Sequence, residues 1–256
     1  MNFPRFFVDQ TCEPDAIVPL DEQDISHASN VLRLKTGDRV GLVSAGRLWD
    51  ARMESVTRRQ ATARIVSELY RDECARSDVS ELPERVTVLQ ALLKGNKLDF
   101  VTEKVVELGA SGIVPVRCER SYGDASNAKL NRWRRIARAA AQQSRRLMVP
   151  VVHPPIDWRE ALQRFTTSAR LLVAHASAPR GSLAAALAAQ DDAQHDVRAA
   201  GELVLATGPE GDFSDEELRS AVDAGCQVVS LGPTTLRAET AAAAMIAAVA
   251  ALRGWW

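Results

Sequence analysis

The sequence lacks several features that would fix its class at once. It has no run of about 18 apolar residues, so no membrane-spanning helix is predicted. Its first residues, MNFPRFFVDQ, show no basic segment followed by an apolar stretch, which argues against a secretory signal. The four cysteines lie far apart, without a Cys-x-x-Cys pair, and the four histidines show no ligand spacing. These absences favour a cytoplasmic protein with reduced cysteines and no bound metal.

A strong overall charge is also missing, because the formal net charge of the 256 residues is only −1. The charge is nevertheless uneven. Residues 90–150 hold 12 Lys and Arg against 5 Asp and Glu, whereas residues 151–256 hold 8 against 13. The local excess of positive charge predicts a polyanionic partner such as RNA for the middle of the chain.

The first part of the chain, residues 1–72, has the pattern of a small β-rich module. Short alternating runs predict strands at Val40–Gly46, Leu48–Val56 and Ala61–Leu69. Residues 73–85 lose this periodicity and end beside a proline, so they are interpreted as a linker.

From residue 86 to residue 256 the pattern changes to strands that alternate with helices. Continuous apolar runs predict buried strands, and the segments between them are amphipathic. This order is typical of an α/β domain with a parallel sheet covered on both faces. The predicted strands are 86–93, 112–118, 170–175, 202–208 and 227–232, and the predicted helices are 97–110, 129–147, 157–165, 182–190, 214–225 and 239–252.

Two unusual stretches each follow a predicted strand. The first is ATGPEGDFSDEEL, from Ala206 to Leu218, and the second is LGPTTLRAETA, from Leu231 to Ala241. Ligands of parallel α/β sheets bind at the carboxyl ends of strands, so both stretches are candidates for a site. No Walker phosphate loop and no dinucleotide-binding glycine motif is present. A ligand recognised through backbone amides and carbonyls is therefore favoured.

Part of the first stretch has a purely structural interpretation. Ser214 and Glu217 predict a capping box, and Gly225 suits the end of the helix that follows. Glu210 precedes the cap and is not explained in this way, although a simple turn remains an alternative for the corner. In the second stretch, the simplest interpretation of Arg237 and Glu239 is a local ion pair that closes the loop.

GPEGDFS followed by SLGPTTLRAETA resembles the ribosomal RNA (uracil-N3)-methyltransferases of the SPOUT class. The resemblance extends over nearly the whole chain, through RFFV at residues 5–8, HASNVLRLKTGD at 27–38, KGNKLDFVTEKVVELGASGIVPV at 94–116 and RWRRIARAAAQQSRR at 132–146. Two departures stand out. Asp212 replaces the usual second glycine of GPEGG, and Thr234 with Thr235 replaces the usual Arg-Ile.

The resemblance implies a PUA-like β-barrel followed by a SPOUT α/β domain with a trefoil knot. It also implies S-adenosylmethionine as cofactor, a homodimer packed partly on the last helix, and small-subunit ribosomal RNA as substrate, methylated on N3 of one uridine. Carried over residue by residue, it predicts a cofactor site formed by Ala174, His175, Thr207, Gly208, Pro209, Glu210, Gly211, Leu231, Gly232, Leu236 and Thr240.

The chemistry of methyl transfer suggests roles for three charged residues. The N3 atom of uridine carries a proton that has to be removed, and the base becomes anionic as this happens. Arg237 is the candidate for orienting the base or stabilising its anion. Glu210 or Glu239 is the candidate proton acceptor, although each could instead be a structural partner of Arg237.

Basic residues provide the predicted RNA contacts. The predicted helix 129–147 carries an excess of arginine without acidic residues four positions away, which favours phosphate binding over a merely solvated face. Trp133 in this helix could stack on a base, but burial against the sheet is the favoured interpretation. The predicted RNA-binding residues are Arg5, Arg33, Lys94, Lys97, Lys104, Arg134, Arg138, Arg145 and Arg146.

Two rival functions remain open from the sequence. One is another RNA methyltransferase with the same cofactor, such as a ribose 2′-O-methyltransferase. The other is a ribosome assembly factor that binds RNA without catalysis, which the changes at Asp212 and Thr234 make conceivable.

Overall fold

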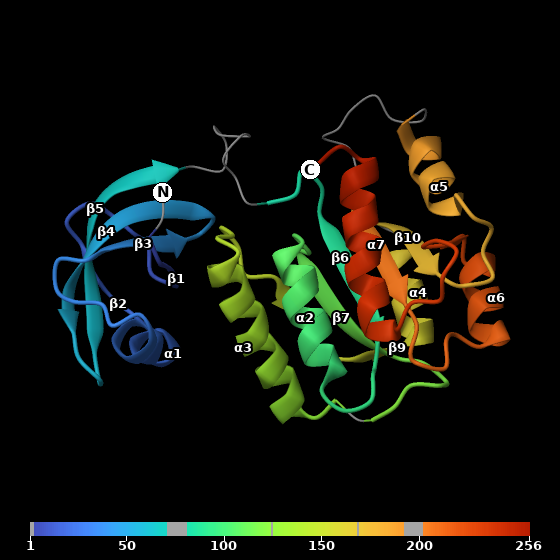
Figure 1. Ribbon diagram of the computed structural model, residues 1–256, viewed down its shortest axis with the longest axis horizontal. Helices are drawn as coiled ribbons and strands as arrows, with labels where there is room; N and C mark the ends of the chain where they lie inside the picture. The colour runs from blue at the N-terminus through green and yellow to red at the C-terminus, as the bar shows by residue number, and fades with distance from the viewer. Residues whose placement is uncertain (1–2, 71–80, 124, 168, 192–201) are drawn as a thin grey trace. The chain divides into compact units, whose positions relative to one another are not determined.

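The computed structural model describes residues 3–70, 81–123, 125–167, 169–191 and 202–256. The chain forms two compact units, coloured from blue to red along the sequence in Figure 1. The first unit comprises residues 1–81 together with 141–149, and the second comprises residues 82–140 and 150–256. The predicted linker, residues 73–85, lies mostly outside the described residues.

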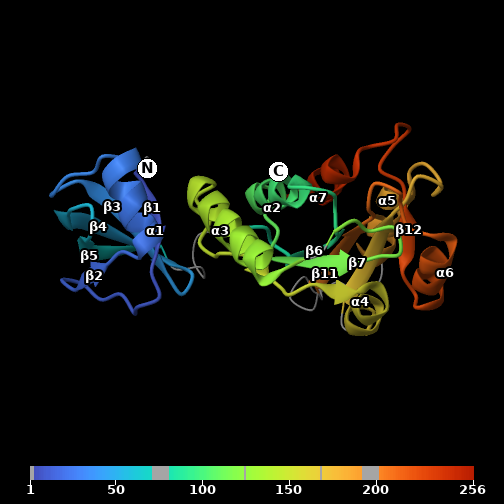
Figure 2. The same cartoon turned by 90° about the horizontal axis from the view of Figure 1, so that it is seen from below.

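The first unit contains a five-stranded sheet in the order β1-β3-β4-β5-β2. Strand β1 pairs with β3 in parallel, and the other pairs are antiparallel. Buried residues such as Phe6, Leu42 and Ile65 form a core on one face of this sheet, and Figure 2 shows helix α1 beside its strands. The strands are β1 (Arg5–Phe7), β2 (Ile17–Pro19), β3 (Arg39–Ser44), β4 (Arg47–Val56) and β5 (Ala61–Tyr70).

The three long strands of this unit agree with the prediction, whereas its short elements were missed. Strands β1 and β2 have three residues each, which is too short for an alternating pattern. Helix α1 (Glu22–Ser26) starts at Asp21, whose carboxylate accepts a hydrogen bond from the Asp24 amide at 2.8 Å. It continues directly into the π-helical turn His27–Val31.

The second unit is an α/β domain around a parallel sheet in the order β12-β10-β11-β6-β7-β8, with β9 paired to β7. Every strand pair in it is parallel, which confirms the predicted sheet type. The strands are β6 (Val86–Ala91), β7 (Gly112–Arg117), β8 (Val151–Val152), β9 (Ile156–Asp157), β10 (Ala169–Ala174), β11 (Glu202–Thr207) and β12 (Gln227–Val229).

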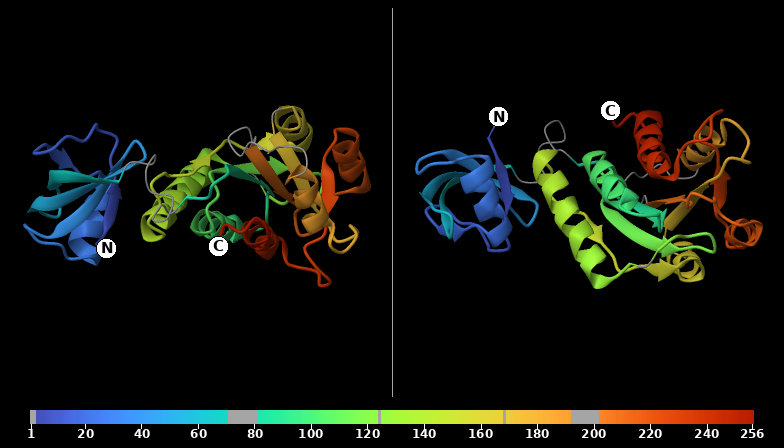
Figure 3. Two further views of the ribbon diagram at one scale, coloured as in Figure 1. Left: turned by 90° about the horizontal axis from the view of Figure 1, so that it is seen from above. Right: turned by 60° about the horizontal axis from the view of Figure 1, so that its bottom comes forward.

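Helices cover both faces of the parallel sheet, as Figure 3 shows. On one face, α4 (Trp158–Phe165) and α6 (Asp215–Asp223) pack on strand residues such as Leu171 and Val204. On the other, α7 (Ala238–Leu252) contacts β6 and β11 and packs against α2 (Lys97–Glu107) and α5 (Ser182–Asp191). Sheet strands buried on both sides explain the continuous apolar runs in the sequence.

The basic helix is shorter than predicted, and this corrects one assignment. Helix α3 spans Asn127–Gln143 rather than residues 129–147, and Arg145 has a left-handed φ of 62°. The chain after the helix buries Arg146, of which only 1% is exposed. Arg146 is therefore not a surface residue available to RNA.

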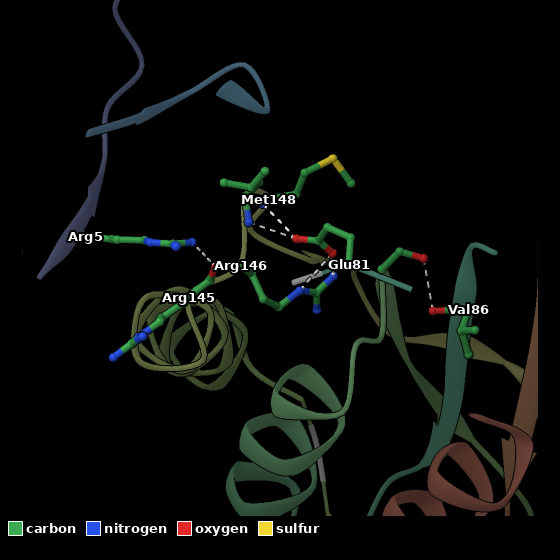
Figure 4. Close-up of polar contacts among 8 residues, drawn as sticks. Arg5, Glu81, Val86, Arg145, Arg146 and Met148 are labelled. Atoms are coloured by element: carbon green, nitrogen blue, oxygen red, sulfur yellow. Dashed lines mark hydrogen bonds and ion pairs between the residues drawn. The ribbon is translucent and has the colours of Figure 1, made fainter. Parts of the chain in front are cut away.

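Arg146 instead forms an ion pair with Glu81 (Figure 4). One carboxylate oxygen of Glu81 accepts hydrogen bonds from the Arg146 guanidinium, including Nε at 3.0 Å. The other accepts from the amides of Leu147 and Met148 at 2.9 and 3.1 Å. The buried charges thus satisfy each other and two backbone groups, as burial requires.

Candidate functional site

A cavity of about 490 Å³ opens at the carboxyl ends of three adjacent strands of the second unit. Strands β12, β10 and β11 are neighbours in the sheet, so the loops that follow them meet at one edge. Both unusual stretches of the sequence contribute to the walls. The lining residues are Lys97, Ala174–Ala176, Thr207–Glu210, Asp212, Ser230–Glu239 and Ala241.

The corner after β11 is tight at both of its glycines. A Cβ atom on Gly211 would lie 3.3 Å from both Cβ and Cδ of Arg120. A Cβ atom on Gly208 would lie 3.0 Å from Asp212 Oδ1 and 3.2 Å from the Phe213 amide nitrogen. Neither glycine has a positive φ, so the close approach of these neighbours, and not the backbone angle, disfavours a side chain at both positions.

Helix α6 fixes the far end of this corner. Ser214 Oγ accepts a hydrogen bond from the Glu217 amide at 3.3 Å, and Glu217 Oε2 accepts one from the Ser214 amide at 2.9 Å. The predicted capping box is thereby confirmed. Glu217 Oε1 also accepts from the Glu119 amide at 2.8 Å, and Arg120 donates to the Gly211 carbonyl at 3.0 Å. The loop after β7 therefore holds the corner from the side.

Lys97 occupies the wall of the cavity between the two candidate glutamates. Its Nζ atom lies 2.9 Å from Glu210 Oε1 and 3.3 Å from Glu239 Oε2. Lys97 was predicted to bind RNA, whereas in the structure it lines the cavity and pairs with both carboxylates. Lys97 Nζ comes from the start of α2, and the two carboxylates come from the corner after β11 and the start of α7.

These contacts shift the ionisation of two groups. The hydrogen bond to Glu210 is the largest influence on Lys97 and raises the pKa of its ammonium group above the ordinary value. At Glu210, burial opposes the charged form, but hydrogen bonds from Lys97, from its own backbone and from the Lys94 amide outweigh burial and lower its pKa. Both groups are therefore charged at neutral pH.

Arg237 lies at the exposed rim of the cavity, directly before α7. Within the part of the chain that the structure describes, it forms no ion pair, because Glu210 and Glu239 both face Lys97. The local Arg237–Glu239 pair considered above is therefore absent. This leaves the guanidinium of Arg237 available to a ligand in the cavity.

Asp212 and His175 form a second polar pair in the cavity wall. Nε2 of His175 lies 3.2 Å from Asp212 Oδ2, and Nδ1 lies 2.7 Å from Ser177 Oγ. The Ser177 amide also donates to Nδ1 at 3.2 Å. The imidazole thus connects the loop after β10 with the Asp212 carboxylate in the loop after β11.

Most of the predicted cofactor residues meet in this cavity. Nine of the eleven line it, whereas Gly211 and Thr240 lie outside its lining. The hydroxyl of Thr207 donates a buried hydrogen bond to Oε1 of Gln90 on strand β6 at 2.8 Å. Lys97 and Asp212 also line the cavity but were not among the predicted cofactor residues, although Asp212 stood out as a departure from the family pattern.

The predicted RNA-binding residues of the second unit are mostly exposed. Lys94 and Arg134 are exposed, and Arg138 is half-buried. Arg134 Nε donates to the Val152 carbonyl at 3.2 Å. Lys104 contacts Glu103 and Glu107 at 2.7 and 3.0 Å, so part of its charge is neutralised.

In the first unit, Arg33 and Arg145 are exposed, and Arg5 donates to the Arg145 carbonyl. Trp133 on α3 belongs to the second unit and is buried. Its Nε1 donates to Asp99 Oδ1 at 3.1 Å, which confirms that it packs inside rather than stacking on a base.

Among the described residues, no group of three or more His, Cys, Asp or Glu side chains is arranged to hold a metal ion. None of the described helices is long and apolar enough to cross a membrane. Cys74 lies outside the described residues, and Cys12, Cys118 and Cys226 are free thiols.

Two family models match the chain. The model of an RNA methyltransferase domain matches residues 80–250, and the model of an RNA methyltransferase PUA domain matches residues 20–66. The first match contains the whole cavity, and the second lies in the five-stranded unit, which supports the PUA-like fold predicted there.

Similar proteins agree with these matches. A Mycobacterium bovis protein named ribosomal RNA small subunit methyltransferase E is 33% identical, over 98% of this chain and 92% of the relative. A Synechocystis protein of the same name is 34% identical, over 93% of this chain and 74% of the relative. The crystal structure of the Neisseria gonorrhoeae protein of that name, bound to S-adenosyl methionine, is 31% identical, with a TM-score of 0.82 over 98% of both chains.

Proposed function

Since this chain belongs to the RNA methyltransferase family, we propose that it transfers a methyl group from S-adenosylmethionine to N3 of a uridine in 16S ribosomal RNA of the small subunit. The observation that carries this proposal is the cavity at three adjacent strand ends, which brings together the GPEGD and LGPTTLRAET stretches. Relatives that match nearly the whole chain are named as small-subunit rRNA methyltransferases. Small subunits as substrate also support a cytoplasmic site of action.

The residues of the cavity fit this cofactor. Its volume of about 490 Å³ lies within the range of small-molecule sites. Leu231, Leu236 and Ala174 offer apolar walls, whereas Gly208, Pro209 and Gly232 expose backbone groups. A structural neighbour from Legionella pneumophila, 26% identical with a TM-score of 0.82, contains bound S-adenosylmethionine. When bound, the cofactor supplies a methyl group on a positively charged sulfur.

The residues of this chain would align the base and remove its proton. Methyl transfer needs the attacking nitrogen in line with the methyl group, and positioning of this kind supplies roughly 7–11 kcal/mol. Arg237 lies at the rim with its guanidinium unpaired among the described residues, so we assign it to the anion that forms on the base.

Glu239 is the better candidate for the proton acceptor. Glu210 accepts hydrogen bonds from Lys97 and from the Lys94 amide, and its lowered pKa makes it a weak base. Glu239 also lines the cavity, and its Oε2 has Lys97 Nζ at 3.3 Å as its one partner among the described residues, without a backbone amide. Lys97 would then hold both carboxylates in place while Glu239 takes the N3 proton.

The remaining assignments concern RNA and assembly. We assign residues 1–72 to RNA binding and residues 86–256 to catalysis, joined by 73–85, with Arg5, Arg33, Lys94, Lys104, Arg134, Arg138 and Arg145 as RNA contacts. The strand order β12-β10-β11 is compatible with a trefoil knot, which a continuous backbone trace in an experimental map would test.

The alanine-rich helix α7, followed by the exposed Trp256, supports a homodimer, which light scattering would test.

The proposal is tested by offering labelled S-adenosylmethionine with purified small and large ribosomal subunits that lack the modification. We expect label in the RNA of the small subunit alone, at about one methyl group per particle. Calorimetry with the cofactor distinguishes the failures. Binding without transfer to either subunit would mean a different substrate, whereas an absence of binding would leave only an RNA-binding protein.

A further inference from the structure

Asp212 stands at a position that its backbone would normally reserve for glycine. Its φ is 58°, in the left-handed region that asparagine and aspartate tolerate better than other side chains. The carboxylate compensates locally, because Oδ1 accepts a hydrogen bond from the Phe213 amide at 2.9 Å. The side chain lines the cavity and is 40% exposed.

The second oxygen of this carboxylate lies beside His175. Oδ2 is 3.2 Å from Nε2 of the ring, whose Nδ1 accepts a hydrogen bond from the Ser177 amide. The Phe213 amide and the imidazole come from different loops and hold the carboxylate against the cavity wall. Neither carries the permanent positive charge of a lysine or an arginine.

The charges of the cavity are otherwise matched within one cluster. Glu210 and Glu239 share the charge of Lys97, and Arg237 lies at the exposed rim. Within the described residues, Asp212 has no lysine or arginine partner. The cavity lining thus contains three carboxylates against two permanent cations, and Asp212 accounts for the difference.

We propose that Asp212 is a specificity residue that favours the positively charged form of the cofactor over its product. The inference rests on the proposed function. During transfer the bond between sulfur and methyl breaks, its electron pair stays on sulfur, and the new bond forms to N3, whose proton passes to Glu239. The ligand left in the cavity, S-adenosylhomocysteine, has one positive charge fewer, so a carboxylate without a lysine or arginine partner attracts it less than the substrate.

The effect is modest because the carboxylate is partly solvated. A unit charge interacting across several ångströms of partly aqueous surroundings corresponds to about a three- to fivefold difference in affinity. A preference of this size would weaken inhibition by S-adenosylhomocysteine, because it strengthens binding of S-adenosylmethionine without strengthening binding of the product to the same extent.

The test is a set of calorimetric titrations of the full chain with S-adenosylmethionine and with S-adenosylhomocysteine. Asp212→Asn keeps the shape and the tolerance of a positive φ but removes the charge, and Asp212→Gly removes the side chain. Asp223→Asn, an exposed carboxylate on α6 outside the cavity lining, is the matched control.

We expect Asp212→Asn to weaken binding of S-adenosylmethionine about three- to fivefold at low salt and to leave S-adenosylhomocysteine unchanged. High salt should shrink the difference, and Asp223→Asn should show none. Equal loss of both ligands, or no change in either, would overturn the inference while the proposed function survives. Failure of the unsubstituted protein to bind either ligand would overturn both.

Discussion

At the scale of single residues, one lysine is the ion partner of two carboxylates in the cavity. Lys97 serves two carboxylates from different segments of the chain, and this leaves Arg237 at the rim without an ion partner among the described residues. A side chain placed in this way can act on the reacting base rather than on the protein. The division of roles between Lys97 and Arg237 leads to two predictions.

Arg237→Ala should separate chemistry from cofactor binding. Loss of a group that stabilises charge in the transition state typically lowers kcat by about 10²–10³. We expect this loss in a methyl-transfer assay, whereas the Kd for S-adenosylmethionine in calorimetry should change less than about threefold. Arg219→Ala, on the exposed surface of α6, is the control. A parallel loss of both properties would make the role of Arg237 structural.

Lys97→Met should destabilise the protein over a defined range of pH. The pKa of Glu210 is lowered in the folded chain, so its contribution is present above its unfolded pKa and is lost as pH falls through the folded value. The pKa of Lys97 is raised, so its contribution is lost only as pH rises through the folded value.

The difference in Tm between the original protein and Lys97→Met should therefore be largest between about pH 5 and pH 10 and should shrink on both sides. Thermal unfolding across this range provides the measurement. Lys35→Met, in an exposed turn of the first unit, should show no such window. A difference that is constant from pH 3 to pH 11 would mean that the ion pairs do not contribute.

At the scale of helices and strands, the sequence predicted the regular elements well and the exceptions have physical reasons. Long buried strands and amphipathic helices carry a period that can be recognised, so β6, α2, β11 and α7 were predicted within a few residues. Strands of two or three residues are too short to show such a period. The order in which strands pair depends on contacts between distant segments and could not be derived from local patterns.

The candidate site was predicted where it depended on local motifs and missed where it depended on tertiary contacts. Glu210 and Arg237 belong to recognisable stretches. Lys97 lies 113 residues before Glu210, so nothing in its neighbourhood indicated their contact. Arg146 was assigned to RNA because its helix was predicted to continue, whereas α3 ends at Gln143 and the chain turns inward.

Helix α3 should contribute measurably to the salt dependence of RNA binding. Each phosphate contact adds about 0.7–0.9 to the slope of log affinity against log salt concentration. We expect the double substitution Arg134→Gln and Arg138→Gln to flatten the slope by about 1.5, measured by fluorescence anisotropy on ribosomal RNA fragments. Arg159→Gln, exposed on α4, should leave it unchanged. An unchanged slope in the double variant would remove α3 from the RNA surface.

At the scale of the whole molecule, residues 141–149 belong to the first compact unit although they include the end of helix α3, which begins in the second. The ion pair between Arg146 and Glu81 lies inside that unit and joins two segments that are distant in sequence. Its burial makes it sensitive to the loss of either partner.

Arg146→Met should cost about 3–5 kcal/mol of unfolding free energy, because it leaves a buried carboxylate without its counter-charge. Urea unfolding measured by circular dichroism would show this loss. Arg58→Met, exposed in the turn between β4 and β5, should change the free energy by less than about 0.5 kcal/mol. A similarly small effect of Arg146→Met would mean that the hydrogen bonds from the Leu147 and Met148 amides are enough to stabilise the Glu81 carboxylate.

We expect the cavity to direct a methyl group onto N3 of a uridine in small-subunit RNA. Mass spectrometry of nucleosides and fragments from RNA methylated in vitro by the purified chain tests this expectation. It should show one modified uridine per small subunit, with the methyl group on N3, and no product from the Arg237→Ala variant. A methyl group on a ribose 2′-oxygen, or on a base other than uracil, would contradict this expectation.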